Sequence, residues 1–337
     1  MSRRKLSQRQ IERIGRLQDQ RRERLAQRVE EQLADTPAAG EPREGRVLVR
    51  HGARLAVDLD QGGGTPHLCQ IRQNIGHPVC GDRVVWQPLG PGAGVVTALL
   101  PRSTTLARPN LYGQDKALAA NLSQLVVVVA PLPEPVEYLL DQYLVAAERI
   151  GLGALIALNK MDLLEPDGQV QFKQRFARYE RIGYPMLTLS ARWERGLIPL
   201  ERALAQQASI LVGQSGVGKS SLIKALLPDL EIQTNRLSEA TGLGRHTTST
   251  ATWYALPQGG ALVDSPGVRS FRLGPIGIRD LELGYRECRA LAGGCQFGDC
   301  HHDQEPGCAL KAAVSDGRVA PERLASFRHM AARLGRS

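Results

Sequence analysis

A glycine-rich segment, Gly213–Ser220 (GQSGVGKS), limits the possible folds of this chain more than any other feature. It follows the apolar run Ile210–Val212, which suits a buried strand, and precedes residues 221–227, which suit a helix. A glycine-rich turn from strand to helix presents backbone N–H groups and a helix N-terminus to phosphate oxygens. The match to GxxxxGK[ST] in this context therefore predicts a phosphate-binding loop in an α/β core.

The loop also assigns roles to side chains. Lys219 is expected to reach the β and γ phosphates of a nucleotide, and Ser220 to ligate Mg²⁺. The residues predicted to contact the phosphates are Gly213, Gln214, Ser215, Gly216, Val217, Gly218, Lys219, Ser220 and Ser221.

A second motif, Asn159-Lys160-Met161-Asp162, follows the apolar run ALIAL and indicates which base is read. A carboxylate such as Asp162 can accept hydrogen bonds from both N1–H and the exocyclic amine of guanine, whereas adenine offers no such donor pair. Asn159 can bond the acceptor edge of the purine. Ser190-Ala191, after the run MLTL, suits a second base-binding loop in which a backbone N–H meets the guanine oxygen. GTP and GDP are the predicted ligands.

Two further segments suit switches that sense the γ-phosphate. In Asp264-Ser-Pro-Gly267, Asp264 would hold Mg²⁺ through water and the Gly267 N–H would face the γ-phosphate. Between the phosphate-binding loop and this motif, either Thr247 or Thr248 would supply a threonine ligand to Mg²⁺, and position favours Thr248.

The residue after the second switch motif raises a catalytic question. Many nucleotide hydrolases of this kind place a water-orienting Gln there, but this chain has Val268, which cannot orient water. Either hydrolysis is slow and depends on a partner, or another side chain orients the water. His246 in the first switch is the candidate, and an ordinary surface histidine is the alternative.

The order of the motifs is circularly permuted. NKxD and SA precede the phosphate-binding loop, the switch threonines and DxxG, whereas the ordinary order of these motifs places the loop first. Binding survives because every motif still follows a parallel strand at one edge of the sheet. The expected buried strands are residues 125–130, 154–158, 186–189, 210–212 and 260–263, with helices at 134–150, 169–182 and 321–334.

The N-terminal part of the chain differs from the rest in its charge and in its hydrophobic pattern. Residues 1–28 carry ten Lys or Arg against three acidic residues, a net of +7 out of +9 for the chain, which suggests a polyanionic partner or a solubilising tail. Residues 45–100 then contain short alternating runs that suit a small closed barrel of the OB type, with an SH3-like barrel as the alternative. The expected strands are residues 46–50, 54–59, 67–72, 83–86 and 95–100.

Four of the six cysteines lie between Cys288 and Cys308. The spacing Cys295-x4-Cys300-x-His302-x5-Cys308 offers three thiolates and one imidazole, which predicts a closed, structural tetrahedral Zn²⁺ site. His301 could replace His302 as a ligand. This Gly- and Asp-rich stretch promises little hydrophobic core, so a metal is expected to organise it.

These segments together resemble one family, the ribosome small-subunit-dependent GTPase A family of bacteria. The resemblance covers nearly the whole chain and rests on CGDRVVW, ARPN, LNKMDLL, GQSGVGKSSLIKALLP, GLGRHTTST, DSPGVRSF and CQFGDCHHDQEPGCAL. It implies a multidomain protein with an OB-type barrel, a circularly permuted α/β P-loop GTPase core and a small zinc-binding helical domain. The expected bounds are 1–40 for the basic arm, 41–104 for the barrel, 105–275 for the GTPase and 276–337 for the zinc domain.

The resemblance also implies an activity. Hydrolysis of GTP would be weak alone and stimulated by the small ribosomal subunit, during late maturation of that subunit. His246 matches a proposed catalytic histidine of the family, and the implied zinc ligands are Cys295, Cys300, His302 and Cys308. A GTP-gated RNA-binding module with incidental hydrolysis is the rival function. We expect a cytoplasmic monomer. No membrane contact is expected, since the longest apolar run, Leu125–Ala130, is too short to span a bilayer.

Overall fold

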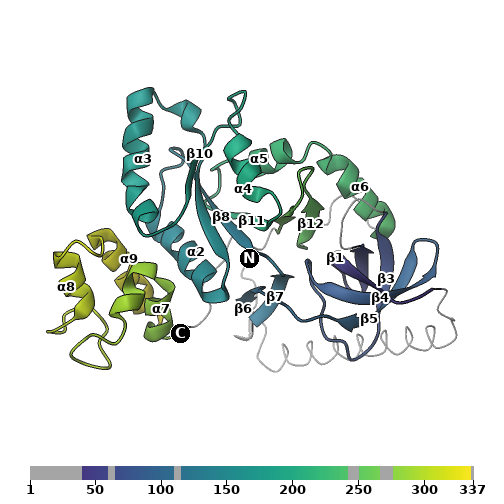
Figure 1. Ribbon diagram of the computed structural model, residues 1–337, viewed down its shortest axis with the longest axis horizontal. Helices are drawn as coiled ribbons and strands as arrows, with labels where there is room; N and C mark the ends of the chain where they lie inside the picture. The colour runs from purple at the N-terminus through teal and green to yellow at the C-terminus, as the bar shows by residue number, and fades with distance from the viewer. Residues whose placement is uncertain (1–39, 60–64, 110–114, 242–249, 266–275, 335–337) are drawn as a thin grey trace, which may run out of the picture.

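The computed structural model describes residues 40–59, 65–109, 115–241, 250–265 and 276–334. Figure 1 shows a small barrel at one side, a set of short helices at the other, and a helix-covered sheet between them. No helix among the described residues is long and apolar enough to cross a membrane.

The barrel contains all five strands that the alternating pattern predicts. They are β1 (Arg43–His51), β2 (Arg54–Asp58), β3 (His67–Ile71), β4 (Arg83–Gly90) and β5 (Ala93–Leu99). β3 pairs in parallel with β5, and β4 returns to pair with β1, so the circuit closes in the order 1-2-3-5-4. This is the OB order and confirms the OB-type prediction over the SH3-like alternative. Fully buried Trp86 fills the interior with Val47, Leu55 and Cys69.

The CGDRVVW segment joins the barrel to the rest of the protein. The buried carboxylate of Asp82 accepts hydrogen bonds from the Val79 N–H and from two nitrogens of Arg102. Gly81 has a positive φ of +87°, and a Cβ there would lie 2.2 Å from the Ala120 carbonyl oxygen. Burial raises the pKa of the adjacent Cys80 thiol. This cysteine is a core residue.

The barrel strands are part of a larger sheet, and the other half of that sheet is parallel. Its strands are β8 (Gln124–Val129), β9 (Gly153–Leu158), β10 (Met186–Thr188), β11 (Ala208–Val212) and β13 (Ala261–Asp264). All five were predicted, and they pair in the order β10-β9-β8-β11-β13. β12 (Thr252–Ala255), which was not predicted, runs antiparallel to β13 and also pairs with β1 of the barrel. One sheet of 11 strands therefore runs through both parts.

The hairpin β6 (Thr105–Pro109) and β7 (Asp115–Ala120) is a separate two-stranded sheet that was also not predicted.

Helices cover the two faces of the 11-stranded sheet. They are α2 (Glu137–Ile150), α3 (Pro166–Arg181), α4 (Ile198–Leu204), α5 (Lys219–Leu226) and α6 (Leu230–Thr241). α2 begins three residues later than predicted because Glu134 precedes a proline, which disfavours helical backbone. α3 begins three residues earlier than predicted, because Pro166 suits the first helical position.

The C-terminal region has a core of its own, larger than its composition suggested. It consists of α7 (Ile278–Gly284), the 3₁₀ segment η3 (Arg286–Leu291), α8 (Ala309–Ser315) and α9 (Pro321–Leu334). The bounds of α9 match the prediction. Phe327 and Met330 of α9 are buried against Leu310, Cys288 and Tyr285.

A buried ion-pair cluster fastens this region to the parallel sheet. Arg323 of α9 is 2% exposed and bonds Asp141 of α2 and Glu287 of η3. Asp141 also accepts a hydrogen bond of 2.7 Å from the Tyr179 hydroxyl of α3. The Arg323 guanidinium lies 4.2 Å from the ring centroid of Tyr285. The C-terminal helices are therefore attached through charges that have lost their solvent.

Replacing Arg323 should loosen the C-terminal region. In Arg323→Met the carboxylates of Asp141 and Glu287 stay buried without their cation, which should cost about 3–5 kcal/mol. Hydrogen exchange of the α9 amides measures this loss as faster opening. Arg318→Met is the control, because Arg318 pairs with Asp316 at an exposed site and should cost at most about 1 kcal/mol. Equal protection of α9 in both variants would contradict this description of the interface.

Candidate nucleotide-binding site and metal centre

The predicted nucleotide-binding residues that the structure describes lie at one edge of the sheet. Asn159 follows β9, Ser190 follows β10, Gly213 follows β11, and Asp264 ends β13. β8, β9, β10, β11 and β13 pair in parallel, so their carboxyl ends share that edge. The structure thus brings together motifs as far apart in the sequence as Asn159 and Asp264.

The phosphate-binding loop needs its glycines. Gly213 has a φ of +139°, and a Cβ there would lie 2.3 Å from the Val128 carbonyl oxygen. Gly218 has a φ of +98° and precedes α5, and its Cβ would lie 2.5 Å from the Asn159 side-chain nitrogen. The close approach of β8 at Gly213 and of the Asn159 side chain at Gly218, together with the positive φ, therefore excludes side chains at both positions.

Lys219 lies at the first position of α5, and its side chain bonds the phosphate-binding loop. Its Nζ donates to the carbonyl oxygens of Gly213 at 2.8 Å and Gln214 at 2.5 Å. These bonds hold a positive charge beside the N–H groups of the loop and the N-terminus of α5. The arrangement favours an anionic group such as a phosphate.

The base-reading segment is tied directly to the phosphate-binding loop. Asn159 is 2% exposed, and its Nδ2 donates to the Val217 carbonyl oxygen at 2.9 Å. Lys160 has a φ of +58°, and its Nζ donates to the Gly216 carbonyl oxygen at 2.6 Å. Within the described part of the chain, the buried Asn159 Oδ1 has no hydrogen-bond partner. This orphaned acceptor suits a donor supplied by a ligand.

Asp162 and Ser190 form the second part of the base site. The Ser190 hydroxyl donates to Asp162 Oδ1 at 2.6 Å, and Asp162 Oδ2 lies 3.6 Å from the Arg192 guanidinium. Ser190 is fully buried, which fixes the Asp162 carboxylate from behind. Gly196 packs against this loop so closely that a Cβ would lie 2.0 Å from the Ser190 carbonyl oxygen. Sequence reasoning missed this glycine, because nothing in its own neighbourhood marks the contact.

Other predicted residues differ in what they contribute. The Met161 side chain is buried in the hydrophobic core, so only its backbone is available to the site. Gln214 turns its side chain to the start of α2, where Oε1 accepts from the Val136 N–H at 2.9 Å. Ser215 and Ser220 are exposed, and Asp264 is exposed at the end of β13. His246, Thr247, Thr248, Gly267 and Val268 lie outside the described residues.

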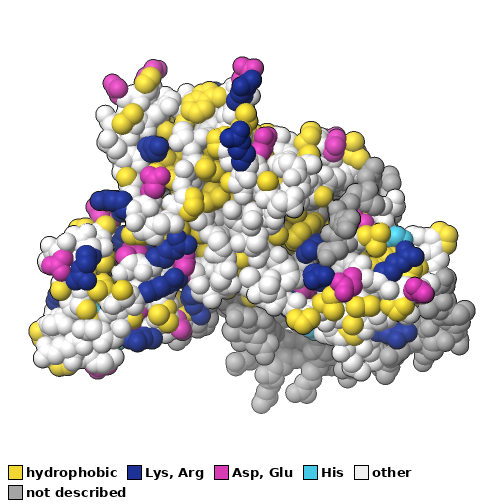
Figure 2. All heavy atoms as spheres, viewed as in Figure 1, with side chains coloured by type: hydrophobic (Ala, Val, Ile, Leu, Met, Phe, Trp, Pro, Cys, Tyr) yellow, Lys and Arg dark blue, Asp and Glu magenta, His cyan; other side chains and the backbone are white. Residues whose placement is uncertain are grey.

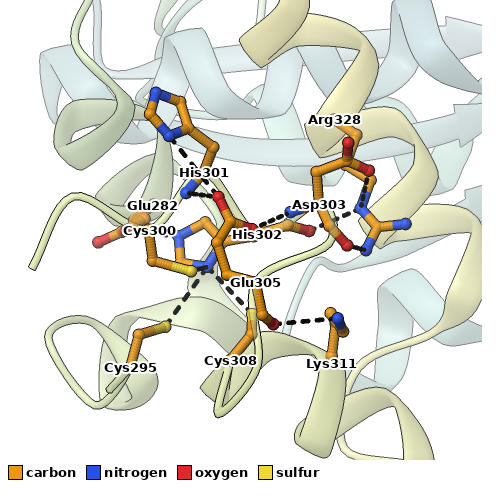
Figure 3. A network of polar contacts seen from close by, with 10 residues as sticks. All are labelled: Glu282, Cys295, Cys300, His301, His302, Asp303, Glu305, Cys308, Lys311 and Arg328. Carbon is orange, nitrogen blue, oxygen red and sulfur yellow. Dashed lines mark hydrogen bonds and ion pairs between the residues drawn. The ribbon is translucent and has the colours of Figure 1, made fainter. Parts of the chain in front are cut away.

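A second cluster lies in the C-terminal region, where Cys295, Cys300, His302 and Cys308 converge (Figure 3). Their potential ligand atoms all lie within 4.8 Å of one another. His302 Nδ1 is 3.5 Å from the Cys295 sulfur, 3.6 Å from Cys300 and 3.4 Å from Cys308. A set of three thiols and one imidazole fits tetrahedral Zn²⁺ with no open position.

The structure selects between the two neighbouring histidines. His302 is buried with its ring among the sulfurs, and its backbone φ is +61°. His301 is exposed, and its backbone N–H donates to Glu305, which also accepts from the Asp303 N–H (Figure 3). These backbone N–H groups, that of His301 first, lower the pKa of Glu305 to about 2. His302, and not His301, belongs to the cluster.

The local structure shifts the pKa values of Cys300 and Cys308 in opposite directions. Burial raises the pKa of Cys300 to about 12. Burial also acts to raise the pKa of Cys308, but hydrogen bonds from the backbone N–H groups of Lys311 and Leu310 and from His302 outweigh it and lower that pKa. Cys308 lies directly before the first turn of α8, which contains Leu310 and Lys311. A metal ion would favour the thiolate at every position.

Comparisons with known proteins agree with this geometry. A family model described as RsgA GTPase matches residues 99–274. The small ribosomal subunit biogenesis GTPase RsgA of Azotobacter vinelandii is 44% identical over 99% of this chain and 98% of its own length. Its counterpart from Alcanivorax borkumensis is 45% identical over 97% of this chain and 95% of its own.

Solved structures give the same result. YjeQ from Thermotoga maritima has a TM-score of 0.72 at 31% identity, covering 87% of this chain and 99% of that one. YloQ, described as a circularly permuted GTPase, has a TM-score of 0.70 at 26% identity, covering 88% of this chain and 96% of its own.

The fit of Gly213 predicts a loss of binding in Gly213→Ala. The new Cβ would meet the Val128 carbonyl oxygen and strain the backbone, at a cost of about 3 kcal/mol or roughly 100-fold in the Kd for GDP. Titration calorimetry measures the affinity, and circular dichroism confirms that the variant folds. Gly92→Ala is the control, because Gly92 also has a positive φ but nothing lies near its Cβ position. A Gly213 variant that binds GDP normally would contradict the described packing.

Proposed function

The chain belongs to the RsgA GTPase family, and from that premise we propose how this small ribosomal subunit biogenesis GTPase works. It binds GTP at the sheet edge, hydrolyses it slowly alone, and is stimulated when it docks on the small subunit late in maturation. The observation that carries the proposal is the pair of bonds from Asn159 and Lys160 to the phosphate-binding loop. They join a guanine-reading motif to a phosphate site in spite of the permuted order.

In this proposal each described residue has one task toward GTP. Asp162, held by Ser190, reads N1–H and the exocyclic amine of guanine, while the Ala191 backbone N–H meets the guanine oxygen. The N–H groups of residues 213–221 and the Lys219 ammonium hold the phosphates. Asn159 Nδ2 donates one hydrogen to the Val217 carbonyl oxygen and offers the other to the acceptor edge of the purine, while Oδ1 accepts from the ligand or from water bound beside it.

Magnesium is the proposed partner of the bound nucleotide. Ser220, Thr248 and Asp264 would hold it, the last through water, and the ion would supply charge neutralisation at the β and γ phosphates. Thr247 is the alternative to Thr248. The exposed Ser220 and Asp264 support this assignment, because Ser220 lies in the first turn of α5, directly after the phosphate-binding loop, and Asp264 ends β13 at the same sheet edge.

The hydrolytic step needs a water molecule aligned with the γ-phosphate. Val268 is apolar, so we assign the orientation of that water to His246, in the first switch. Gly267 would sense the γ-phosphate through its N–H. The assignment of His246, Thr248 and Gly267 rests on the sequence motifs alone.

The proposed partner is the rRNA of the small subunit. The basic arm, residues 1–28, the OB barrel and the Lys and Arg side chains over the C-terminal region (Figure 2) supply positive surface for phosphates. We propose a cytoplasmic monomer, with domains bounded at 40/41, 104/105 and 275/276. The rival, a GTP-gated RNA-binding module with incidental hydrolysis, is favoured only by Val268.

Zn²⁺ is the proposed structural metal, one per chain, at Cys295, Cys300, His302 and Cys308. The donor set and its convergence support it. Bound zinc would hold the loops before α8 against α7 and α9 and has no part in the hydrolysis of GTP.

Base specificity tests the assignment of Asp162. Asp162→Asn turns a double acceptor into a mixed donor and acceptor, so it should weaken GDP binding and shift preference toward xanthosine diphosphate. The measurement is the Kd of each nucleotide for wild type and variant. Wild-type protein that binds ATP as tightly as GTP, or a variant unchanged toward GDP, would contradict guanine reading.

Catalysis tests the assignment of His246. His246→Ala should leave GTP affinity nearly unchanged and lower subunit-stimulated turnover by roughly 10²-fold, the range for losing an orienting group. Single-turnover hydrolysis at saturating GTP and saturating small subunits gives the rate. Lys219→Ala is the contrasting variant, since it should weaken binding as well. A normal rate in His246→Ala would move the catalytic group elsewhere.

A further inference from the structure

Helix α7 carries a carboxylate that the ligand set of the metal centre does not include. Glu282 is 5% exposed, and its Oε1 lies 2.7 Å from His302 Nε2 (Figure 3). Its other oxygen faces Arg279 at 3.4 Å, but the Arg279 side chain is 62% exposed. A buried carboxylate is costly unless it is paired. The contact with His302 is therefore the main compensation that the structure provides.

The two nitrogens of the His302 ring face different groups. Nδ1 faces the three cysteine sulfurs, and Nε2 faces Glu282. A ligand nitrogen must offer a lone pair to the metal, so the ring proton of a metal-bound His302 lies on Nε2 and is donated to Glu282. This fixes both the tautomer and the orientation of the ring.

Other contacts hold the ring in the same position. The Phe327 ring meets it edge-on at a centroid distance of 5.3 Å, and Arg328 Nε donates to the His302 carbonyl oxygen at 2.7 Å. Neither contact chooses between the nitrogens. Glu282 is the group that does.

We propose that Glu282 is the positioning residue of the metal centre and that it makes α7 part of that centre. Its carboxylate accepts the Nε2–H of His302, raises the basicity of Nδ1 and increases the affinity for Zn²⁺. The inference rests on the proposal that the cluster holds zinc.

The same helix contacts the nucleotide-binding part of the protein. A Cβ on Gly284 would lie 2.6 Å from Val145 Cγ1 of α2, so α7 and α2 pack at backbone distance. Leu281 and Tyr285 are fully buried in the core that includes Val145. Glu282 thus links the metal cluster to α7, the helix that packs on α2, and zinc stabilises the packing of α7 on α2.

Charge supports the assignment. Zn²⁺ with three thiolates and one neutral imidazole leaves one net negative charge, and Glu282 adds a second. Three cationic side chains near the cluster offset these charges. Arg279 faces Glu282. Arg328 donates to the backbone carbonyl oxygens of His302 and Asp303, and Lys311 donates to that of Glu305.

Zinc affinity of the full-length protein tests the inference. Competition with a chromogenic chelator gives the Kd for Zn²⁺ of wild type, Glu282→Ala and Glu282→Gln. We expect Glu282→Ala to raise the Kd by 10- to 100-fold, the range for loss of such a partner. Glu282→Gln keeps an acceptor oxygen without the charge and should recover part of that loss. Asp280→Asn, the same charge change at an exposed position of the same helix, should bind zinc as wild type does.

Two further readouts separate positioning from a merely structural role. With ¹⁵N-labelled histidine, zinc-loaded wild type should show a slowly exchanging proton on His302 Nε2 that Glu282→Ala lacks. The α7 amides should exchange more slowly with zinc than without it in wild type, and this difference should shrink in Glu282→Ala.

The outcomes distinguish the two proposals. Wild-type protein that contains no zinc would overturn the zinc assignment and this inference together. Wild-type zinc binding with an unchanged Kd in a folded Glu282→Ala would overturn the role of Glu282 alone. GDP affinity, measured on every variant, reports the nucleotide site independently of either result.

Discussion

The nucleotide site depends on the register of β11 between its two neighbours. Ile210 of β11 pairs with Leu125 of β8 on one side and Val263 of β13 on the other. Because all three strands run parallel, their carboxyl ends lie at one level, and the loops that follow them meet. The strands themselves are nearly all buried aliphatic residues, so burial of apolar surface maintains the register on which the polar site depends.

This register also explains how a permuted chain keeps the site. The hydrogen bonds of Asn159 and Lys160 to the phosphate-binding loop run between loops that follow β9 and β11, and they depend on the position of the strands rather than on their order. Permutation moves β13 to the end of the core, so α7 and the metal centre are the next described elements in the sequence. At the other side, β12 pairs with both β13 and β1, which joins the OB barrel to the same sheet. The three parts therefore share continuous packing around one sheet.

Some of these features could be read from sequence and others could not. The glycines of the phosphate-binding loop, the NKxD motif and the cysteine spacing are local patterns whose residue types are dictated by backbone geometry or ligand chemistry. β12 was missed because TWYA is only four residues long and lacks the aliphatic run that marks the other strands of the core. Glu282 and Arg323 were missed for a different reason. Each acts on residues far along the chain, His302 for one and Asp141 for the other, and nothing near them in the sequence marks that contact.

We propose that GTP hydrolysis at this sheet edge is coupled to the small ribosomal subunit. The direct measurement is the GTP turnover of the full-length chain alone, with purified small subunits and with purified large subunits, at saturating GTP. This coupling predicts slow turnover alone, a large increase with small subunits that weakens as salt is raised, and little change with large subunits. Turnover that is the same in all three conditions would contradict it.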